Sequence, residues 1–447
     1  MTSASSALIT LTELTEKGDG VGLLDGRKIF VSGGLPGEQV SVRLHGIKPA
    51  YAQGELLTVV TPSADRVANF CPHTECGGCQ LGVMNYPAQL RLKRERTVAA
   101  LARYQLTAEV KACVGMERPF AYRNKMLYAV QPSAEGLELG FDRKASHTLI
   151  ACDDCAIQPE LSQQLVAMVR LWARECGVEP YDEQQHRGQL RYLMLRDGRQ
   201  SGEWMVVLVT LGEVLPGIDR LLERLQAVPG VCSVVQNINP EPGNRILGMT
   251  NRLLWGSGVI TDSLDGLRFA LSPLSFYQIN PEQTRRLYGE ALRQAALKGE
   301  EQVFDLYCGV GTISLYLARQ ARSVVGVEIV PEAIEDAREN ARLNNLTNTE
   351  FYAGKAEVVV PELYAKGYRA DVVVVDPPRK GCERVVLDTI LQMAPRTLVY
   401  VSCDPGSLAR DLAYLQPRGY RLDAVQPEDM FPHTLHVETV VRLRLCR

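Results

Sequence analysis

The stretch Val303-Phe-Asp-Leu-Tyr-Cys-Gly-Val-Gly-Thr312 decides the fold, because a short apolar strand leads directly into a Gly-x-Gly turn that opens a helix. Glycine lets a backbone approach a ligand closely, and Gly309 is the first glycine of this turn. The third glycine of a dinucleotide-binding Gly-x-Gly-x-x-Gly fingerprint is missing. The next apolar run, Val324-Val-Gly-Val-Glu328, ends in an acid about 20 residues beyond the turn, where a carboxylate accepts hydrogen bonds from ribose hydroxyls. The two features predict an α/β domain with a ribose-binding edge.

Helices and buried strands alternate through the whole C-terminal part of the chain. Short apolar runs predict strands at 303–306, 323–328, 350–353, 372–376 and 397–402, and the segments between them predict helices at 311–320, 331–344, 384–393 and 406–415. This order is typical of a doubly wound α/β domain, a Rossmann-like fold that binds ligands at the carboxyl ends of its strands.

The composition of the 447-residue chain is that of a globular protein, with 46% hydrophobic and 23% charged residues. At about 150 residues per domain, we expect about three domains. No apolar run approaches the roughly 20 residues that span a bilayer, and the first ten residues do not read as a secretory signal. We therefore expect a cytoplasmic protein with no membrane partner, and the sequence indicates no obligate protein partner.

The charge is unevenly distributed along the chain. The net charge of −3 excludes a uniformly basic nucleic-acid coat, yet residues 66–125 hold ten Lys or Arg against four acids. Such a stripe is a candidate phosphate-binding footprint. The run Arg91, Lys93, Arg94 and Arg96 is equally well a solvated helix face.

Residues 1–62 predict a small β-barrel. Five strands are expected at 8–14, 20–24, 28–31, 38–47 and 50–60, with glycine-containing turns between them. Five short strands in about sixty residues are typical of an OB-like barrel, a fold that often binds oligonucleotides. Residues 63–265 are expected to form a mixed α+β central domain, with helices at 86–104 and 158–176, and residues 266–447 the Rossmann-like domain.

Polar residues end or interrupt three apolar strands of the last domain. The prolines of Asp376-Pro-Pro-Arg379 force an extended exit that aims Asp376 into the ligand cleft. A similar motif in amino-methyltransferases has an aromatic residue at the position of Arg379, so methylation of an exocyclic amine is not expected. Cys403 ends the next strand beside a helix N-terminus, which predicts a lowered thiol pKa. Glu438 interrupts an apolar strand, and a buried unpaired carboxylate is costly.

Taken singly, Cys403 is a buried thiol and Glu438 a salt-bridged structural acid about as readily as either is catalytic. Together they suit one reaction, methylation of uracil at C5. Because C5 is a poor nucleophile, a thiolate first adds to C6 and gives C5 carbanion character. C5 then attacks a methyl sulfonium, and a carboxylate removes the C5 proton as the thiol leaves.

Five motifs together resemble those of the bacterial RNA (uracil-C5)-methyltransferase family, and the likeness covers nearly the whole chain: Phe276-Tyr-Gln-Ile-Asn280, Asp305-Leu-Tyr-Cys-Gly-Val-Gly311, Asp376-Pro-Pro-Arg379, Ser402-Cys-Asp-Pro405 and His436-Val-Glu438. The resemblance implies a nucleophile at Cys403, a base at Glu438, and an S-adenosylmethionine site at Gln278, Tyr307, Gly309, Glu328 and Asp376. It also implies an RNA-binding barrel of the TRAM type at the N-terminus. Asp404 stands where the family more usually has Asn, a change that we expect to be tolerated.

A cysteine motif, Cys71-Pro-His-Thr-Glu-Cys76-Gly-Gly-Cys79, has the spacing of metal-binding thiolates, with Cys155 as the expected fourth ligand. Such cysteines bind zinc or an iron–sulfur cluster, and Cys152 and His73 are competing ligands. The resemblance implies a 4Fe–4S cluster, as in the rRNA-modifying members of the family, and therefore 23S rRNA as the substrate. Radical chemistry is not expected, because the spacing differs from that of radical enzymes.

Three alternatives stay open at the level of sequence. The same chemistry acts on tRNA in a shorter branch of the family. A non-catalytic RNA-binding protein would keep the barrel and the cysteines, although it would have no need of Cys403 and Glu438. Thiolate addition works equally on cytosine, and only the resemblance favours uracil.

Overall fold

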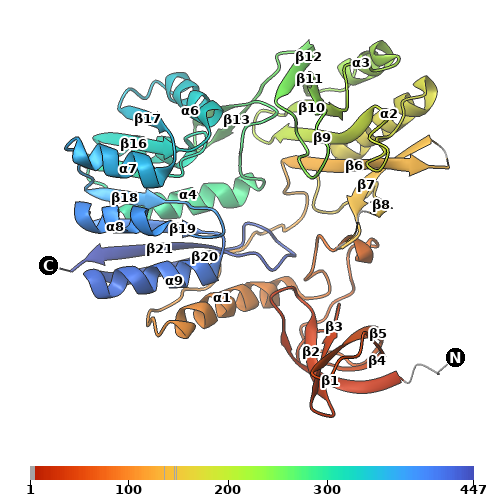
Figure 1. Ribbon diagram of the computed structural model, residues 1–447, viewed down its shortest axis with the longest axis horizontal. Coiled ribbons are helices and arrows are strands. Elements are labelled where there is room, and N and C mark those ends of the chain that lie inside the picture. Colours follow the sequence, from red (N-terminus) through yellow and green to blue (C-terminus); the bar gives the residue numbers. More distant parts are fainter. Residues whose placement is uncertain (1–5, 135, 145, 147, 447) are drawn as a thin grey trace.

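The computed structural model describes residues 6–134, 136–144, 146 and 148–446. The chain forms three bodies: a small barrel, a central seven-stranded sheet, and a second seven-stranded sheet with helices on both faces (Figure 1). Among the described helices, none is long and apolar enough to cross a membrane.

The N-terminal body is a closed five-stranded barrel with the strand order β1-β2-β3-β5-β4. Its strands are β1 (Ser6–Leu14), β2 (Gly20–Leu24), β3 (Arg27–Val31), β4 (Gln39–His45) and β5 (Tyr51–Thr61). Alternate residues such as Ile29 and Val31 of β3 point into the barrel and are fully buried. The predicted five-stranded barrel is therefore confirmed.

A connecting segment and one long helix link the barrel to the rest of the molecule. Helix α1 (Tyr86–Arg103) begins at the N-cap Asn85, whose side chain accepts a hydrogen bond from the Ala88 backbone N–H at 2.9 Å. At its C-terminal end, Ala100 and Leu101 are buried in the core of the C-terminal body. This helix thus packs against a domain that lies more than 150 residues away in the chain.

The central sheet has the strand order β12-β11-β10-β9-β6-β7-β8. Its elements are β6 (Lys125–Ser133), β7 (Gly136–Asp142), β8 (Leu149–Ala151), α2 (Glu160–Cys176), β9 (Leu190–Gly198), β10 (Glu203–Thr210), α3 (Ile218–Gln226), β11 (Val231–Ile238) and β12 (Thr250–Gly256). Helices α2 and α3 cover one face. Met194, Met205 and Val207 of the other face share a core with the C-terminal body, through the hairpin β13 (Ile260–Leu264) and β14 (Leu267–Leu271).

The C-terminal sheet has the order β17-β16-β15-β18-β19-β21-β20. Its strands are β15 (Gln302–Leu306), β16 (Ser323–Glu328), β17 (Thr349–Ala353), β18 (Val372–Val375), β19 (Thr397–Ser402), β20 (Tyr420–Glu428) and β21 (Glu438–Leu445). The first five are parallel, and β21 runs antiparallel between β19 and β20. All four valines of β18 are buried, as expected for a strand covered on both faces.

Helices cover both faces of this sheet, so the doubly wound prediction is confirmed. One face is covered by α4 (Pro281–Ala295), α5 (Thr312–Ala318) and α6 (Pro331–Leu343), and the other by α7 (Ala356–Ala365), α8 (Arg384–Met393) and α9 (Pro405–Leu415). The alternation of the sequence did not predict α4 or α7. Helix α7 contains a valine run and Pro361, which are poor local signals for a helix, and packing of Val360 and Leu363 onto the sheet overrides them.

Candidate active site

The Gly-x-Gly turn after β15 forms one wall of a large cavity. Tyr307 adopts a left-handed backbone with φ of 68°, a conformation that is uncommon for a non-glycine residue and recurs at functional sites. Gly309 is also left-handed, and a Cβ there would meet no atom within 4 Å, so the backbone stays open to a ligand. At Gly311 a Cβ would lie 3.0 Å from the Ala337 Cβ of α6, so glycine also permits the close approach of the two helices.

Glu328, the last residue of β16, is oriented by the backbone on both sides. Its Oε2 accepts a hydrogen bond from the Gly309 N–H at 3.2 Å, and its Oε1 accepts one from the Val330 N–H at 3.0 Å. The carboxylate is therefore held beside the turn, in the position that the sequence predicted for a ribose-binding acid.

Cys403, Asp376 and Glu438 come together because three neighbouring strands meet at one edge of the sheet. Asp376 follows β18, Cys403 follows β19, and Glu438 begins the antiparallel β21. Glu438 is only 4% exposed, whereas Cys403 is half-buried. Arg379 reaches the same edge, and its Nη2 lies 3.1 Å from Nδ1 of His436.

Asp404, which replaces the more usual Asn, is the N-cap of α9. Its Oδ1 accepts a hydrogen bond from the Ser407 N–H at 2.8 Å. Asp and Asn are about equally good N-caps, since each offers one side-chain oxygen to the free backbone donors. The substitution beside Cys403 therefore keeps the local structure.

All seven residues predicted for the catalytic and cofactor sites line one cavity of about 1190 Å³: Gln278, Tyr307, Gly309, Glu328, Asp376, Cys403 and Glu438. The volume exceeds the roughly 300–1,000 Å³ of a typical small-molecule pocket, so two ligands fit side by side. The sequence did not predict that residues 244–247 and 249 and the side chain of Phe276 also line this cavity. Phe276 is 67% exposed, and its place two residues before Gln278 in the same motif was the sequence signal that could have identified it.

The pKa values of the three groups are all raised, which corrects the expected activation of Cys403 by a helix N-terminus. Burial, followed by the charges of Glu438 and Asp376, raises the pKa of the Cys403 thiol to about 12, although Arg379 acts in the opposite direction. Burial and Asp376 raise the pKa of Glu438 to about 8. Burial raises the pKa of Asp376 to about 7. Burial, followed by the two neighbouring acids, outweighs the helix terminus, so the pKa of Cys403 favours the thiol at neutral pH.

The N-terminal and C-terminal parts of the chain each match a known protein family. Residues 266–445 match the tRNA (Uracil-5-)-methyltransferase family, and residues 6–57 match the TRAM domain. An uncharacterized RNA methyltransferase of Halalkalibacterium halodurans is 48% identical over 441 residues, 98% of this chain and 96% of that protein. Another, from Clostridium tetani, is 45% identical over 434 residues, 96% of this chain and 94% of that protein. The chain belongs to the RNA uracil-5-methyltransferase family.

The fold of this methyltransferase is shared over its full length by a solved relative. The crystal structure of Pyrococcus abyssi tRNA (uracil-54, C5)-methyltransferase in complex with S-adenosyl-L-homocysteine superimposes with a TM-score of 0.80 at 29% identity, covering 98% of this chain and 100% of that one. The family resemblance, the TRAM barrel and the dependence on S-adenosylmethionine are therefore confirmed. The reading as a non-catalytic RNA-binding protein is set aside.

The four predicted metal-ligating cysteines of the methyltransferase converge from two segments. Cys79 and Cys155 pack against the same small core of Met116, Tyr122 and Ile157. Burial and then the charges of Cys155, Cys71 and Cys76 raise the pKa of Cys79 to about 12, so all four sulfurs interact electrostatically.

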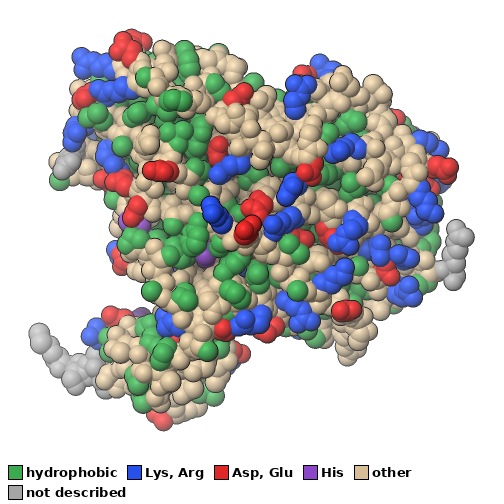
Figure 2. Space-filling view, turned by 180° about the vertical axis from the view of Figure 1, so that it is seen from behind, with side chains coloured by type: hydrophobic (Ala, Val, Ile, Leu, Met, Phe, Trp, Pro, Cys, Tyr) green, Lys and Arg blue, Asp and Glu red, His purple; other side chains and the backbone are tan. Residues whose placement is uncertain are grey.

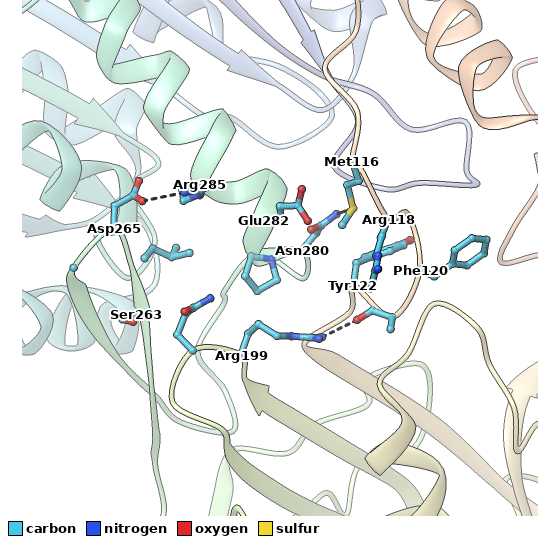
Figure 3. Close-up of a pocket in the computed structure, with 15 residues that line it drawn as sticks. Met116, Arg118, Phe120, Tyr122, Arg199, Ser263, Asp265, Asn280, Glu282 and Arg285 are labelled. Atoms are coloured by element: carbon cyan, nitrogen blue, oxygen red, sulfur yellow. Dashed lines mark hydrogen bonds and ion pairs between the residues drawn. The ribbon is translucent and has the colours of Figure 1, made fainter.

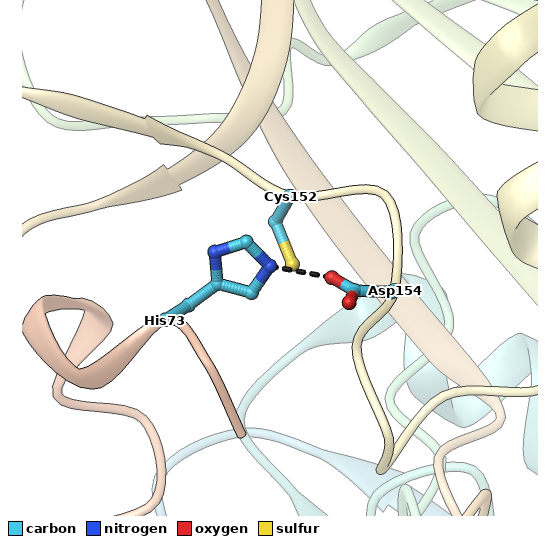
Figure 4. A group of neighbouring side chains, drawn as sticks. All are labelled: His73, Cys152 and Asp154. Atoms are coloured by element: carbon cyan, nitrogen blue, oxygen red, sulfur yellow. Dashed lines mark hydrogen bonds and ion pairs between the residues drawn. The ribbon is translucent and has the colours of Figure 1, made fainter.

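The two competing ligands lie beside this set, because the Cys152 thiol is hydrogen-bonded to Cys155 and His73 interacts electrostatically with Cys155. Within the described parts of the chain, one group of His, Cys and acidic side chains has its ligand atoms within 4.8 Å of one another: His73, Cys152 and Asp154 (Figure 4). His73 Nε2 donates a hydrogen bond to Asp154 Oδ1, and Cys152 is buried. His73 therefore already has a partner within the protein.

A second cavity, of about 650 Å³, contains none of the predicted site residues. The start of α4 lies against it, and Arg118, Arg199 and Arg285 line it, with Arg285 3.9 Å from Asp265 (Figure 3). Seen from behind the view of Figure 1, Lys and Arg side chains are interspersed with acids on the surface (Figure 2).

Much of the basic stretch has an internal role, which corrects its interpretation as a phosphate-binding footprint. Lys93 is fully buried and forms an ion pair with Asp429. Arg66 pairs with Glu38, Arg91 pairs with Asp65 at 2.7 Å, and Arg94 Nε donates to the Val110 carbonyl at 2.9 Å. Lys93 thus fastens α1 to the C-terminal body, Arg91 and Arg94 fasten it to the segments on either side of it, and Arg66 fastens the connecting segment to the barrel.

Proposed function

We propose that this methyltransferase forms 5-methyluridine in 23S rRNA, with Cys403 as the nucleophile and Glu438 as the base. The observation that carries the proposal is that a thiol and a buried carboxylate line the same cavity as the Gly-x-Gly turn and Glu328. Gln278, Tyr307, Gly309, Glu328 and Asp376 bind the cofactor along one side of it. The remaining volume takes a uracil that has left its base stack.

Bound S-adenosylmethionine supplies a methyl group on a positively charged sulfonium. Cys403 loses its proton to water, and its Sγ forms a bond to C6 of uracil while the C5–C6 π electrons move into an enolate with carbanion character at C5. C5 takes the methyl group. Glu438, as the carboxylate, removes the C5 proton, and the electron pair of that bond expels Sγ to restore the C5–C6 double bond.

The raised pKa of Glu438 suits this role. A base whose pKa lies near the working pH combines a sufficient ionised fraction with a strong pull on the proton. Arg379 lowers the pKa values of both Cys403 and Glu438, and a cationic sulfonium in the cavity acts in the same direction. Cofactor binding thus favours the ionised forms that the reaction needs.

We propose further that Cys71, Cys76, Cys79 and Cys155 hold a 4Fe–4S cluster. The chemistry of the donor set fits, because four thiols from two segments interact electrostatically, with His73, Cys152 and Asp154 beside them. In a 4Fe–4S cluster these four thiolates would be the protein ligands. Such a cluster supplies a covalent link between the two segments. All twelve cysteines, every one within the described residues, are free thiols, which supports a reducing cytoplasmic location.

The cysteine set supports rRNA as the substrate, through the family resemblance. A specific observation favours tRNA as the second candidate: the solved relative that matches over the full length is named a tRNA (uracil-54, C5)-methyltransferase. The two candidates share one mechanism and differ only in the RNA that presents the uracil.

Tritiated S-adenosylmethionine, offered with unmodified 23S rRNA and tRNA transcripts, tests the proposal when followed by mass mapping of the labelled nucleotide. We expect label as 5-methyluridine in 23S rRNA, and the number of labelled positions distinguishes single-site from dual-site action. Label in tRNA alone would show that tRNA is the substrate and would leave the proposed mechanism unchanged. Label in 5-methylcytidine, or none in either RNA, would overturn the proposal.

A further inference from the structure

Both ends of the cysteine loop contact a single residue of the C-terminal body, His433. Phe70, which precedes Cys71, has its ring centroid 4.5 Å from that of the His433 imidazole. Leu81, two residues after Cys79, donates its backbone N–H to the His433 carbonyl at 2.9 Å. The segment that carries three of the four thiols is therefore attached to the C-terminal body through His433.

A third contact comes from the core beside the fourth thiol. Tyr122 packs in the same small cluster as Cys79 and Cys155, and its hydroxyl donates to the Pro432 carbonyl at 3.1 Å. Residues 432 and 433 thus receive contacts from the first cysteine segment and from the core on which Cys155 packs.

His433 itself is held in one state. It is 3% exposed, its backbone is left-handed with φ of 67°, and Phe120 stacks on its ring at 4.9 Å. Nε2 lies 2.9 Å from the Pro119 carbonyl, which can only accept, so Nε2 carries the proton. Nδ1 then accepts from the Gln89 amide at 3.2 Å, and burial lowers the pKa of His433 to about 4, which keeps the ring neutral.

The loop that contains His433 also lines the active-site cavity. Phe431 and His436 line the cavity with Cys403 and Glu438, and Glu438 is five residues beyond His433. The start of the loop is fixed independently, because Lys93 Nζ donates to the Phe431 carbonyl at 3.0 Å. The second half is held at one end by the contacts of His433 and at the other by the pairing of Glu438 with Glu428 across β20 and β21.

We propose that His433 is a positioning residue that transmits the arrangement of the cysteine loop to Glu438, so that a filled cysteine site sets the geometry of proton removal from C5. The inference rests on the proposed function and adds to it a part for the cysteine site in one chemical step. Cys403 is positioned instead by the end of β19 and the start of α9. Adduct formation should therefore depend much less on His433 than adduct release does.

Two readouts on the metal-loaded protein separate these steps. Release of tritium from RNA carrying [5-³H]uridine reports proton removal, and denaturing gels report the covalent enzyme–RNA complex. For His433→Ala we expect tritium release to fall about 10- to 100-fold, the cost of a base misplaced by about 1 Å, with methylated adduct accumulating. Adduct formation should stay close to the wild-type rate.

Matched variants distinguish positioning from general damage. His433→Gln keeps an N–H donor for the Pro119 carbonyl and should restore most of the release rate, whereas His45→Ala, on the exposed surface of the barrel, should match the wild type. Should His433→Ala fold poorly, Gln89→Met removes the amide that accepts the His433 backbone N–H at 2.9 Å, and we expect the same release defect. Cys76→Ser should show that defect too, with no further loss when combined with His433→Ala.

The inference would be overturned if His433→Ala slowed adduct formation and adduct release equally, or if its loss added to that of Cys76→Ser. In either case the proposed function would stand as long as Glu438→Gln accumulates the adduct. If Glu438→Gln accumulates none, the proposed function fails and the inference fails with it.

Discussion

Cys403 and Glu438 stand opposite each other, one position beyond Ser402 and Thr439, the last paired residues of the antiparallel ladder between β19 and β21. The ladder holds the backbone of both residues at one edge of the sheet. A nucleophile and a base on facing strand ends can act on adjacent atoms of a ring that lies between them. In a pyrimidine these adjacent atoms are C6 and C5. The antiparallel insertion of β21 is thus the feature that pairs the two groups.

Cys403→Ala should abolish methylation and the covalent RNA adduct, with a rate loss of at least about 10³-fold, as for the removal of other covalent nucleophiles. The measurement is methyl transfer from tritiated cofactor together with a denaturing gel of the RNA complex. Cys446→Ala, at the exposed end of the chain, is the matched control and should behave as the wild type. Turnover retained in Cys403→Ala would remove Cys403 as the nucleophile.

Glu438→Gln should stall after methyl transfer, because an amide cannot take the C5 proton. We expect a methylated covalent complex to accumulate and turnover to fall by about 10²- to 10⁴-fold. Glu428→Gln is a close control, since Glu428 pairs with Glu438 across β20 and β21 and is equally buried but does not line the cavity. A Glu438→Gln enzyme that releases product normally would show that another group is the base.

The release step should accelerate with pH. Glu438 acts as a base only when it is ionised, and a pKa of about 8 leaves most of it protonated at pH 7. Decay of the preformed methylated complex should therefore rise roughly tenfold between pH 7 and pH 9 and then level off. The decay is followed in single turnovers, so that ionisation of Cys403 before adduct formation does not contribute. A decay rate that does not change with pH would contradict the assignment of Glu438 as the base.

The same burial should cost stability at high pH. Folding raises the pKa of Glu438 from 4.5 to about 8, so its contribution is fully present below pH 4.5 and is lost as the pH rises through 8. Glu438→Gln should thus have a Tm several degrees above the wild type at pH 9 and a similar one near pH 5. Burial also raises the pKa of Glu428 to about 8. Glu428→Gln should therefore raise the Tm at pH 9 in the same way, but it should not stall catalysis. Equal Tm differences at both pH values would argue against an ionised buried carboxylate.

Anaerobically purified protein should contain iron and sulfide at about four of each per chain, as in a 4Fe–4S cluster. Cys155→Ser should lose them, while Cys152→Ser, outside the proposed set, should keep most of both. Metal analysis and the visible absorption spectrum are the measurements. Stoichiometric zinc in place of iron would overturn the cluster assignment. Loss of iron in Cys152→Ser but not in Cys155→Ser would show that Cys152, not Cys155, is the fourth ligand.

Local features of the sequence were sufficient for most of the fold. The five strands of the barrel and the parallel strands of the C-terminal sheet follow from hydrophobic period and glycine-rich turns, which act over a few residues. Helix α7 and the insertion of β21 between β19 and β20 were not predictable, because packing against segments farther along the chain decides them.

The candidate site divides in the same way. Residue type and position at strand ends were enough to select Cys403, Glu438, Asp376 and Glu328, since parallel strands bring their carboxyl ends to one edge. The pKa of Cys403 was predicted in the wrong direction, because burial and then the charges of Glu438 and Asp376 act on the thiol only in the folded chain. Lys93 likewise looked solvated and is the buried partner of Asp429, 336 residues away.

The sequence by itself determined the kinds of domain, the family and the candidate reacting groups, because these depend on local periodicity and on motifs whose residues are close in the chain. Only the tertiary structure decided the electrostatics of the site and the junction at His433. Both depend on burial and on the distance between charges, and those are set by which remote segments pack together. The contact between the cysteine loop and the segment that carries Glu438 spans some 350 residues and has no local signature.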